Sequence, residues 1–185
     1  MIKENSEKDL KQLVVLSAKG DEEAISELIS MHKKLIGNIV HSVLRDWYGS
    51  IDIIQETFIY AFRNINKLKD PEKFKSWICK IAYNLSINEL KRRNLEREYT
   101  EKMGDINYLL EDDKTNNKKI IIEEALQKLK VRDRMVLVLY YYQGFNLKEI
   151  EQITGIKEEN LKMILCRARK KLREKLEGYE YELLS

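Results

Sequence analysis

Apolar residues recur every three or four positions along the first ninety residues, a spacing that places them on one face of an α-helix. Three such stripes are present: Ala24, Leu28, Met31, Leu35, Ile39 and Val43; then Ile51, Ile54, Phe58, Ala61, Phe62 and Ile65; then Phe74, Trp77, Ile78, Ile81 and Leu85. Gly49 and Ser50 interrupt the pattern between the first and second stripes, and Ser50 is a residue type that favours helix N-caps. The only proline, Pro71, lies in a predicted loop at 66–73. We predict three helices here, the third ending in the basic run 91–93.

A second set of stripes begins near residue 119. Apolar positions predict helices over 122–129, 131–142, 147–153 and 158–176, with Val136, Leu139 and Tyr140 facing inward in the second. Residues 94–118 differ, because seven acids accompany four bases with weak periodicity. We interpret them as a flexible acidic linker with one helical turn at 108–110. The predicted fold is all-α, with helical domains at 8–94 and 119–180 joined by a linker at 95–118.

Composition supports this fold class and narrows the functional classes. One proline and seven glycines in 185 residues are too few for the many turns of a strand-rich fold. The net charge of +3 excludes a polycation, so a nucleic-acid site must come from local clustering. No stretch has the length of a signal peptide core or a membrane span. Cys79 and Cys166 are too far apart to form a metal site, so we expect reduced thiols, no metal or cofactor, and a cytoplasmic protein.

Residues 147–172 have the layout of a helix-turn-helix. Gly155 supplies the turn between two helices, and acidic residues open the second helix, whose N-terminal dipole they suit. Seven basic residues and one acid lie between 162 and 175. The outward face offers candidates for duplex contacts: Lys162, Met163, Cys166, Arg167, Arg169 and Lys170. The alternative is an ordinary helical hairpin with a solvated face, and Glu151 counts against the motif because a small residue often lies where the two helices cross.

Two further polar faces accompany this motif. Lys80, Asn84, Asn88 and Lys91 recur at helical spacing, with Tyr83 and Arg92 beside them. Amides can hydrogen-bond base edges and a tyrosine can stack on an unpaired base, although a solvated stripe has the same pattern. Asp52, Gln55 and Glu56 lie together on the polar face of the second helix. Because no nucleophile, metal ligand or phosphate loop accompanies these carboxylates, we expect a protein-docking face or plain solvation and no catalysis.

Taken together, these segments resemble the sigma-70 family, in its small extracytoplasmic-function (ECF) group. The segments are 52–58 (DIIQETF), 74–85 (FKSWICKIAYNL), 143–150 (QGFNLKEI) and 167–172 (RARKKL). The resemblance implies an alternative RNA polymerase sigma factor, which is not an enzyme and takes no small-molecule substrate. Its implied partners are core RNA polymerase (the beta-prime clamp helices and the beta flap), promoter DNA, and a cognate anti-sigma factor that is often membrane-bound.

The resemblance also assigns roles to residues by motif position. Asp52, Gln55 and Glu56 would dock on the clamp helices. The candidates for opening and recognising the minus-ten element are Lys80, Tyr83, Asn84, Asn88, Lys91 and Arg92, with the loop 67–76. Those for the minus-thirty-five duplex are Lys162, Met163, Cys166, Arg167 and Lys170.

Departures from the family pattern bear on the promoter sequence and leave the fold unaffected. Tyr83 stands where the family often has arginine, and Asn88 where it often has aspartate. Met163 and Ile164 replace a more usual serine and arginine, and Ile164 lies beside the inward stripe. The alternative hypotheses are a stand-alone helix-turn-helix transcriptional regulator and, less favoured, a nucleic-acid enzyme. A stand-alone regulator usually needs dimer symmetry, and the sequence has no evident dimerisation segment.

Overall fold

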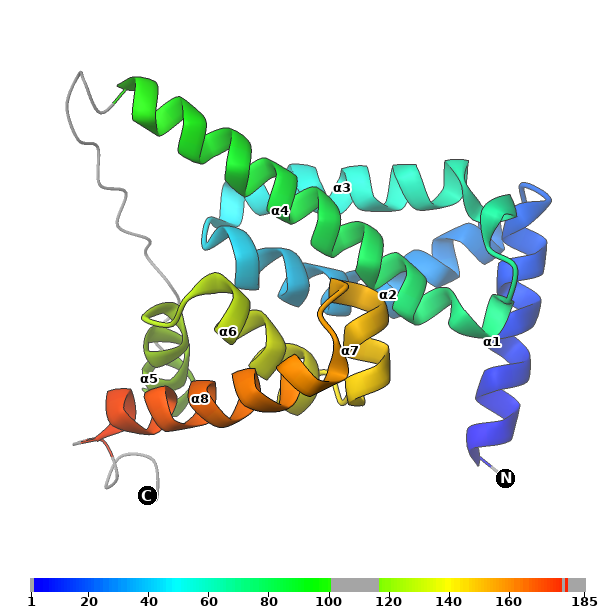
Figure 1. Cartoon of the computed structure of the whole chain (residues 1–185). Coiled ribbons are helices and arrows are strands. Elements are labelled where there is room, and N and C mark those ends of the chain that lie inside the picture. Colours follow the sequence, from blue (N-terminus) through cyan, green and yellow to red (C-terminus); the bar gives the residue numbers. More distant parts are fainter. Residues whose placement is uncertain (1, 101–116, 178, 180–185) are drawn as a thin grey trace.

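The computed structural model describes residues 2–100, 117–177 and 179, and these residues form helices, short turns and no strand (Figure 1). The elements are α1 (Ile2–Ala18), α2 (Glu22–Leu44), α3 (Trp47–Arg63), η1 (Ile65–Lys67), η2 (Pro71–Lys73), α4 (Phe74–Thr100), α5 (Asn117–Gln127), α6 (Val131–Leu137), η4 (Val138–Tyr142), α7 (Leu147–Thr154) and α8 (Glu158–Leu176). The predicted all-α fold with two helical domains is confirmed.

Aspartates cap the N-termini of α2 and α3. An Asp21 Oδ1 accepts a hydrogen bond from the Ala24 N–H at 2.9 Å, and Asp46 Oδ2 accepts one from the Gly49 N–H at 3.1 Å. These carboxylates satisfy backbone donors that have no partner within the first helical turn. The prediction that Ser50 caps the second helix is wrong, because α3 begins at Trp47 and the Ser50 hydroxyl donates to the Asp46 carbonyl inside it.

Helix α2 forms the centre of the N-terminal domain, with α1, α3 and α4 all packed on it. Leu28, Ile36 and Ile39 are fully buried along α2. His32 is buried too, with Nδ1 2.9 Å from the Leu28 carbonyl and its ring edge-on to Phe74 at 5.2 Å between centroids. Burial lowers the pKa of the His32 imidazole, which favours the neutral ring in this core.

Helix α4 is longer than its apolar stripe predicts. It continues past the basic run to Thr100, so helical structure extends about one and a half turns into the predicted linker. Arg92 donates to Glu89 at 2.8 Å and also pairs with Glu96, and such i+3 and i+4 pairs stabilise a helix that lacks an apolar face. Residues 101–116 of the predicted linker, including the turn at 108–110, lie outside the described residues, and its last two residues begin α5.

The helix that contains α6 ends in a π-helical turn, η4. The Gln143 N–H donates to the Val138 carbonyl at 3.0 Å, five residues back, and the Phe145 N–H donates to the Leu139 carbonyl at 3.0 Å. Leu139 is buried as predicted, but Tyr140 is 38% exposed and the prediction that it faces inward is wrong. The wider turn changes the angular spacing of side chains, so helical periodicity does not extend through it.

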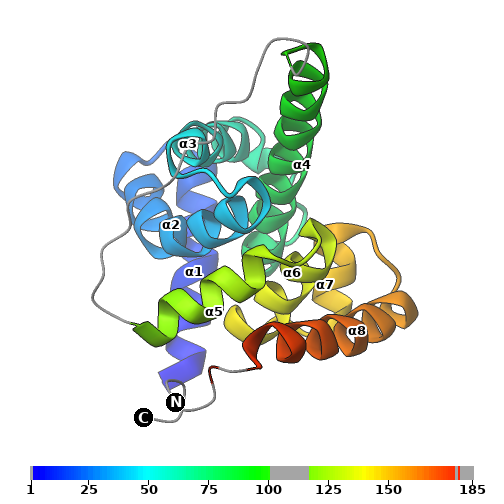
Figure 2. The ribbon, with the colours of Figure 1, turned by 90° about the vertical axis from the view of Figure 1, so that its left-hand side faces the viewer.

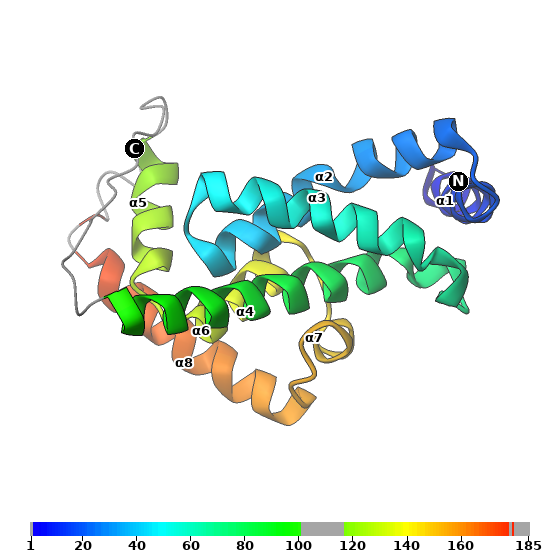
Figure 3. The same cartoon turned by 90° about the horizontal axis from the view of Figure 1, so that it is seen from above.

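The two domains pack directly on each other, with α6 and η4 on α2, and α7 on α4 (Figures 2 and 3). Arg134 Nε donates to the Ser42 carbonyl at 2.5 Å, and Arg45 Nη2 donates to the Leu129 carbonyl at 2.8 Å. Burial, and then the nearby Arg45 charge, lower the pKa of Arg134 to about 10. These hydrogen bonds run from both guanidinium groups to backbone carbonyls, so the contact between the domains holds two like charges close together.

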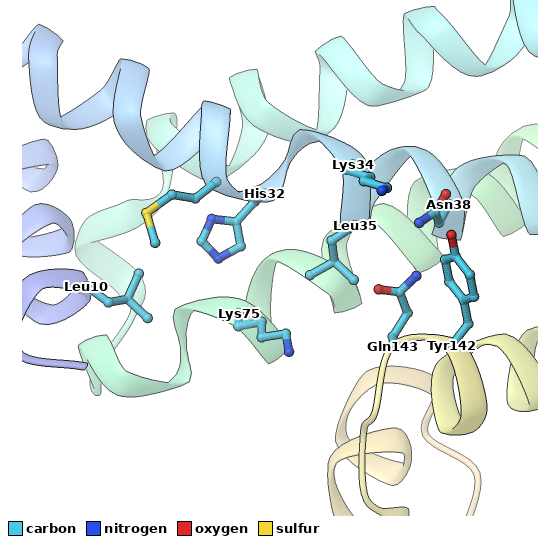
Figure 4. Close-up of a pocket in the computed structure, with 9 residues that line it drawn as sticks. Leu10, His32, Lys34, Leu35, Asn38, Lys75, Tyr142 and Gln143 are labelled. Carbon is cyan, nitrogen blue, oxygen red and sulfur yellow. The ribbon is translucent and has the colours of Figure 1, made fainter. Parts of the chain in front are cut away.

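A groove of about 610 Å³ lies along the junction of the domains (Figure 4). Its lining residues come from α1, α2, α4 and the end of η4, and are Leu10, Met31, His32, Lys34, Leu35, Asn38, Lys75, Tyr142 and Gln143. The Lys75 ammonium also lies 4.6 Å from the centroid of the Phe145 ring, which links α4 to the segment before α7. The charged side chains that line the groove are both lysines, so its electrostatic character is basic.

Candidate nucleic-acid interfaces

Helix α8 has a buried face and an exposed polar face, as a helix that enters a DNA groove requires. Leu161, Ile164, Leu165 and Ala168 are buried against the rest of the domain. The predicted contact residues on the other face are all exposed: Lys162, Met163, Cys166, Arg167 and Lys170. Burial of Ile164 agrees with its place beside the inward stripe. Gly155, with φ of 73°, ends α7 in the left-handed conformation that lets the chain turn toward α8.

Glu151 has a structural role that its sequence position did not suggest. The residue before α8, Lys157, makes no side-chain cap bond. Glu151 Oε2, from α7, accepts a hydrogen bond from the Glu158 N–H at 3.2 Å and so fills that role. A carboxylate at this position also suits the positive end of the α8 dipole. The expectation that Glu151 disfavours the helix-turn-helix is therefore wrong, because the side chain joins its two helices.

Part of the positive charge of α8 is paired within the protein. Arg167 Nη2 lies 2.9 Å from Asp133 Oδ1, and Lys171 Nζ lies 3.5 Å from Asp133 Oδ2. Lys162 pairs with Glu158 at 3.1 Å. The remaining basic residues without an ion pair inside the described part of the chain are Arg169, Lys170, Arg173 and Lys175. The count of seven basic residues from the sequence therefore overstates the charge that α8 presents to solvent.

The polar face of α4 is also open to solvent. Lys80, Asn84, Asn88, Lys91 and Arg92 are exposed along it, as predicted from their spacing.

Two side chains of α4 differ from that pattern. Tyr83 is half-buried against the core, and burial raises the pKa of its phenol while the Arg132 charge from α6 opposes this. Arg92 is held by Glu89 and Glu96, so its guanidinium is partly neutralised. The structure thus brings the predicted minus-ten candidates onto one helix but half-buries Tyr83 against the core.

Helix α3 presents a mixed apolar and acidic surface. Asp52, Gln55 and Glu56 are exposed as predicted. Ile59 and Tyr60 are also exposed, at 51% and 49%, and the sequence analysis did not single them out. Both lie one turn beyond the acidic motif and out of phase with the buried stripe, which is the signal that could have identified them. Ile51, assigned to the inward stripe, is 40% exposed and joins the same surface.

The described part of the structure offers neither a metal site nor a membrane-spanning helix. Within the residues that it describes, no three His, Cys, Asp or Glu side chains come close enough to hold a metal ion. Over the same residues, none of the helices combines the length and the apolar character that crossing a bilayer requires.

Two family models match the chain in the order of its two domains. The model described as Sigma-70 region 2 matches residues 28–96, and the model described as Sigma-70, region 4 matches residues 119–172. The chain belongs to the sigma-70 family. The first match contains the polar faces of α3 and α4, and the second contains the helix-turn-helix.

Curated relatives place this sigma factor in the ECF group. It is 27% identical to the ECF RNA polymerase sigma factor SigW of Bacillus subtilis, over 90% of this chain and 96% of the relative. It is 28% identical to RNA polymerase sigma factor SigV of the same organism, over 78% of this chain and 86% of the relative. The sigma factor therefore spans nearly the whole length of these relatives.

Solved structures share its fold. The sigma factor RpoE of Bartonella quintana, in complex with the anti-sigma factor NepR, matches with a TM-score of 0.73 and 18% identity over 83% of this chain and 96% of that one. CnrH, in complex with the cytosolic domain of CnrY, matches with a TM-score of 0.68 and 21% identity over 92% and 98%. The family models and curated relatives make the protein an ECF-type alternative sigma factor, the class that directs RNA polymerase to promoters.

Proposed function

We propose that this sigma factor uses α3 to bind core RNA polymerase, α4 to hold the opened minus-ten element, and α8 to recognise the minus-thirty-five duplex. This division of roles among the helices rests on one observation. Each of the three helices presents its predicted polar face to solvent while its opposite face is buried. A sigma factor acts by directing the polymerase, so no catalytic residue is assigned.

The α3 surface has the composition of a protein interface. Exposed Ile59 and Tyr60 supply an apolar centre, and Asp52 and Glu56 supply an acidic rim. Interface centres are enriched in aromatic and apolar side chains, whereas rim charges govern association rate and salt dependence. This composition favours docking on the beta-prime clamp helices, and the beta flap is the corresponding proposed contact of the C-terminal domain.

The polar surface of α4 is suited to bind a DNA base that has been unstacked from the duplex. Asn84 and Asn88 lie one turn apart and offer both donors and acceptors, and Lys80 and Lys91 flank them with positive charge. Unstacking a base costs a few kcal/mol, which contacts to its edge and its phosphates must offset. Tyr83 stands beside this face but is half-buried, so base stacking on it requires the ring to become more exposed.

The α8 surface suits paired DNA. Lys162, Met163, Cys166 and Lys170 are exposed along the helix, and Arg167 joins them while bound to Asp133. Methionine can contact a thymine methyl group, and lysine can contact a guanine edge or a phosphate. Few of these groups form bidentate bonds to bases, so DNA shape contributes to promoter choice.

A cognate anti-sigma factor is the proposed negative regulator. One structural neighbour is a sigma factor bound to an anti-sigma factor. In this protein the polymerase-docking surface on α3 is open, so a regulator that covers it would prevent polymerase binding. We propose such a partner for this chain, membrane-bound or free.

Transcription with purified core polymerase on a fragmented genomic library, followed by sequencing of the transcript starts, tests the whole assignment. We expect new starts that share two spaced elements, and loss of these transcripts with the variant I59S/Y60A but not with E27Q, an exposed change on α2. Co-migration with core polymerase on a sizing column should fail for the same double variant. Absence of new starts with the wild-type protein would favour a stand-alone DNA-binding regulator instead.

A further inference from the structure

Asp133 is a buried carboxylate beneath the helix proposed to meet DNA. It lies in the first turn of α6, and its side chain is 1% exposed. Arg167 and Lys171, one turn apart on α8, direct their cationic groups to its two oxygens at 2.9 and 3.5 Å. The two basic side chains themselves are 49% and 38% exposed, so they lie at the edge of the surface that DNA would approach.

The pairing restricts what these two cations can do. If Arg167 and Lys171 both turned to phosphates, Asp133 would remain buried without a counter-charge, and leaving one partner of a buried pair uncompensated is strongly unfavourable. The neighbouring Lys170 is under no such restriction, because it is exposed and has no ion pair within the described residues. Adjacent lysines on α8 are therefore electrostatically different.

We propose that Asp133 determines the DNA specificity of the C-terminal domain by withholding Arg167 and Lys171 from phosphates. This inference rests on the proposed role of α8. Phosphate contacts supply sequence-independent affinity, whereas base contacts and DNA shape discriminate between sequences. Holding two of the basic residues against Asp133 lowers affinity for any duplex, and so leaves a larger share of the binding free energy to the promoter sequence. Asp133 touches no DNA and acts by holding the two side chains.

The expected effect follows from counter-ion release. Each phosphate neutralised contributes about −0.9 to the slope of log affinity against log salt concentration. Releasing two cations by D133N should steepen the slope by about 1.8, so that raising salt from 50 to 200 mM costs the variant roughly 12-fold more affinity than it costs the wild type. The change E174Q alters net charge equally, and Glu174 has no ion pair in the described structure, so this variant serves as the matched control.

A comparison of neighbouring lysines tests the same point with mild surface changes. We would measure binding of the full-length chain to a fluorescent duplex of mixed sequence, at a series of salt concentrations. K170Q should flatten the slope by about 0.9, because it removes a cation free to bind phosphate. K171Q should leave the slope unchanged, because Asp133 already withholds that cation. This pair remains decisive if D133N does not fold.

The outcomes separate this inference from the function on which it rests. A steeper slope for D133N but not E174Q, with K170Q flattened and K171Q unchanged, supports the proposal. Equal flattening by K170Q and K171Q overturns it, while the assignment of α8 to DNA stands. A slope near zero for the wild-type chain, unaltered by K170Q, overturns both.

Discussion

Removing the Glu151 carboxylate should destabilise the protein, although the sequence alone predicts that its removal would stabilise it. A small residue is common where the two helices of a helix-turn-helix cross, so E151A would be expected to relieve crowding. In the structure, Glu151 instead accepts a hydrogen bond from the Glu158 backbone N–H at 3.2 Å, and the residue at the cap position, Lys157, makes no such bond. The two interpretations therefore predict opposite changes in the free energy of unfolding of E151A.

The size of the change can be estimated from its parts. Loss of a capping side chain costs about 1 kcal/mol, and loss of a negative charge at a helix N-terminus costs about 0.3–1 kcal/mol more at an exposed site. The higher helix propensity of alanine in α7 offsets roughly a few tenths of a kcal/mol of this loss of stability. We expect a net loss of about 1 kcal/mol in the free energy of unfolding, or about 2–4 °C in melting temperature for a chain of this size.

Thermal and urea unfolding of the full-length chain, followed by circular dichroism, would measure this change. Q152A, an exposed substitution on the same helix, is the control and should change stability by only a few tenths of a kcal/mol, roughly. Adding K157D to E151A places a capping carboxylate directly before α8 and should restore most of the lost stability. If E151A proves as stable as the wild type, or more so, the capping role assigned to Glu151 is wrong.

Three further outcomes are expected. A Cβ on Gly49 would lie 1.8 Å from Arg93 Nη2 and 2.5 Å from Asp46 Oδ2, so G49A should destabilise the wild type by about 1 kcal/mol by displacing the Arg93–Asp46 ion pair. In R93A the Asp46 contact remains but the Arg93 contact does not, so G49A should cost less stability there, and equal effects in a double-mutant cycle would refute this. Hydrogen bonding from the Arg92 side chain, and then from Arg93, lowers the pKa of Glu89 from 4.5 to about 2. The wild type should therefore exceed E89Q in stability at pH 7 by about 1 kcal/mol, after allowance for solvent screening, and melting curves should converge as pH falls from 4.5 to 2; a constant difference would contradict the pairing. Burial raises the pKa of the Cys79 thiol to about 12, so a thiol reagent at pH 8 should label one cysteine in the native chain, Cys166, and C166S should show no labelling before unfolding.

Local sequence patterns predicted most of the fold. The stripes that end at Val43, Ile65 and Leu85 correspond to α2, α3 and α4, because each helix buries one face against its neighbours. Gly155 was identified as the turn because its role depends on its own backbone conformation. The extension of α4 to Thr100 was missed because ion pairs along the helix, rather than an apolar stripe, support it there.

Contacts between distant residues account for what the sequence did not predict in the site. The candidate residues on α3, α4 and α8 are exposed as expected, except for Tyr83, which packs half-buried against the core. Asp133 and Arg167 are 34 residues apart, and neither periodicity nor composition pairs them. The exposed Ile59 and Tyr60 were missed because single apolar residues outside a buried stripe are common on protein surfaces and do not by themselves mark a site.

The π-turn at Val138–Tyr142 makes chain length at this point a determinant of domain orientation. A π-turn holds one residue more than an α-turn, and each α-helical residue advances the chain by about 100° around the axis. Deleting a single residue there would return the segment to ordinary α-helical hydrogen bonding. Tyr142 and Gln143, which now line the groove beside α2, would then swing to another side of the helix. Related chains could therefore acquire a different packing of the C-terminal domain on the N-terminal domain through the insertion or deletion of one residue here, more readily than through a substitution.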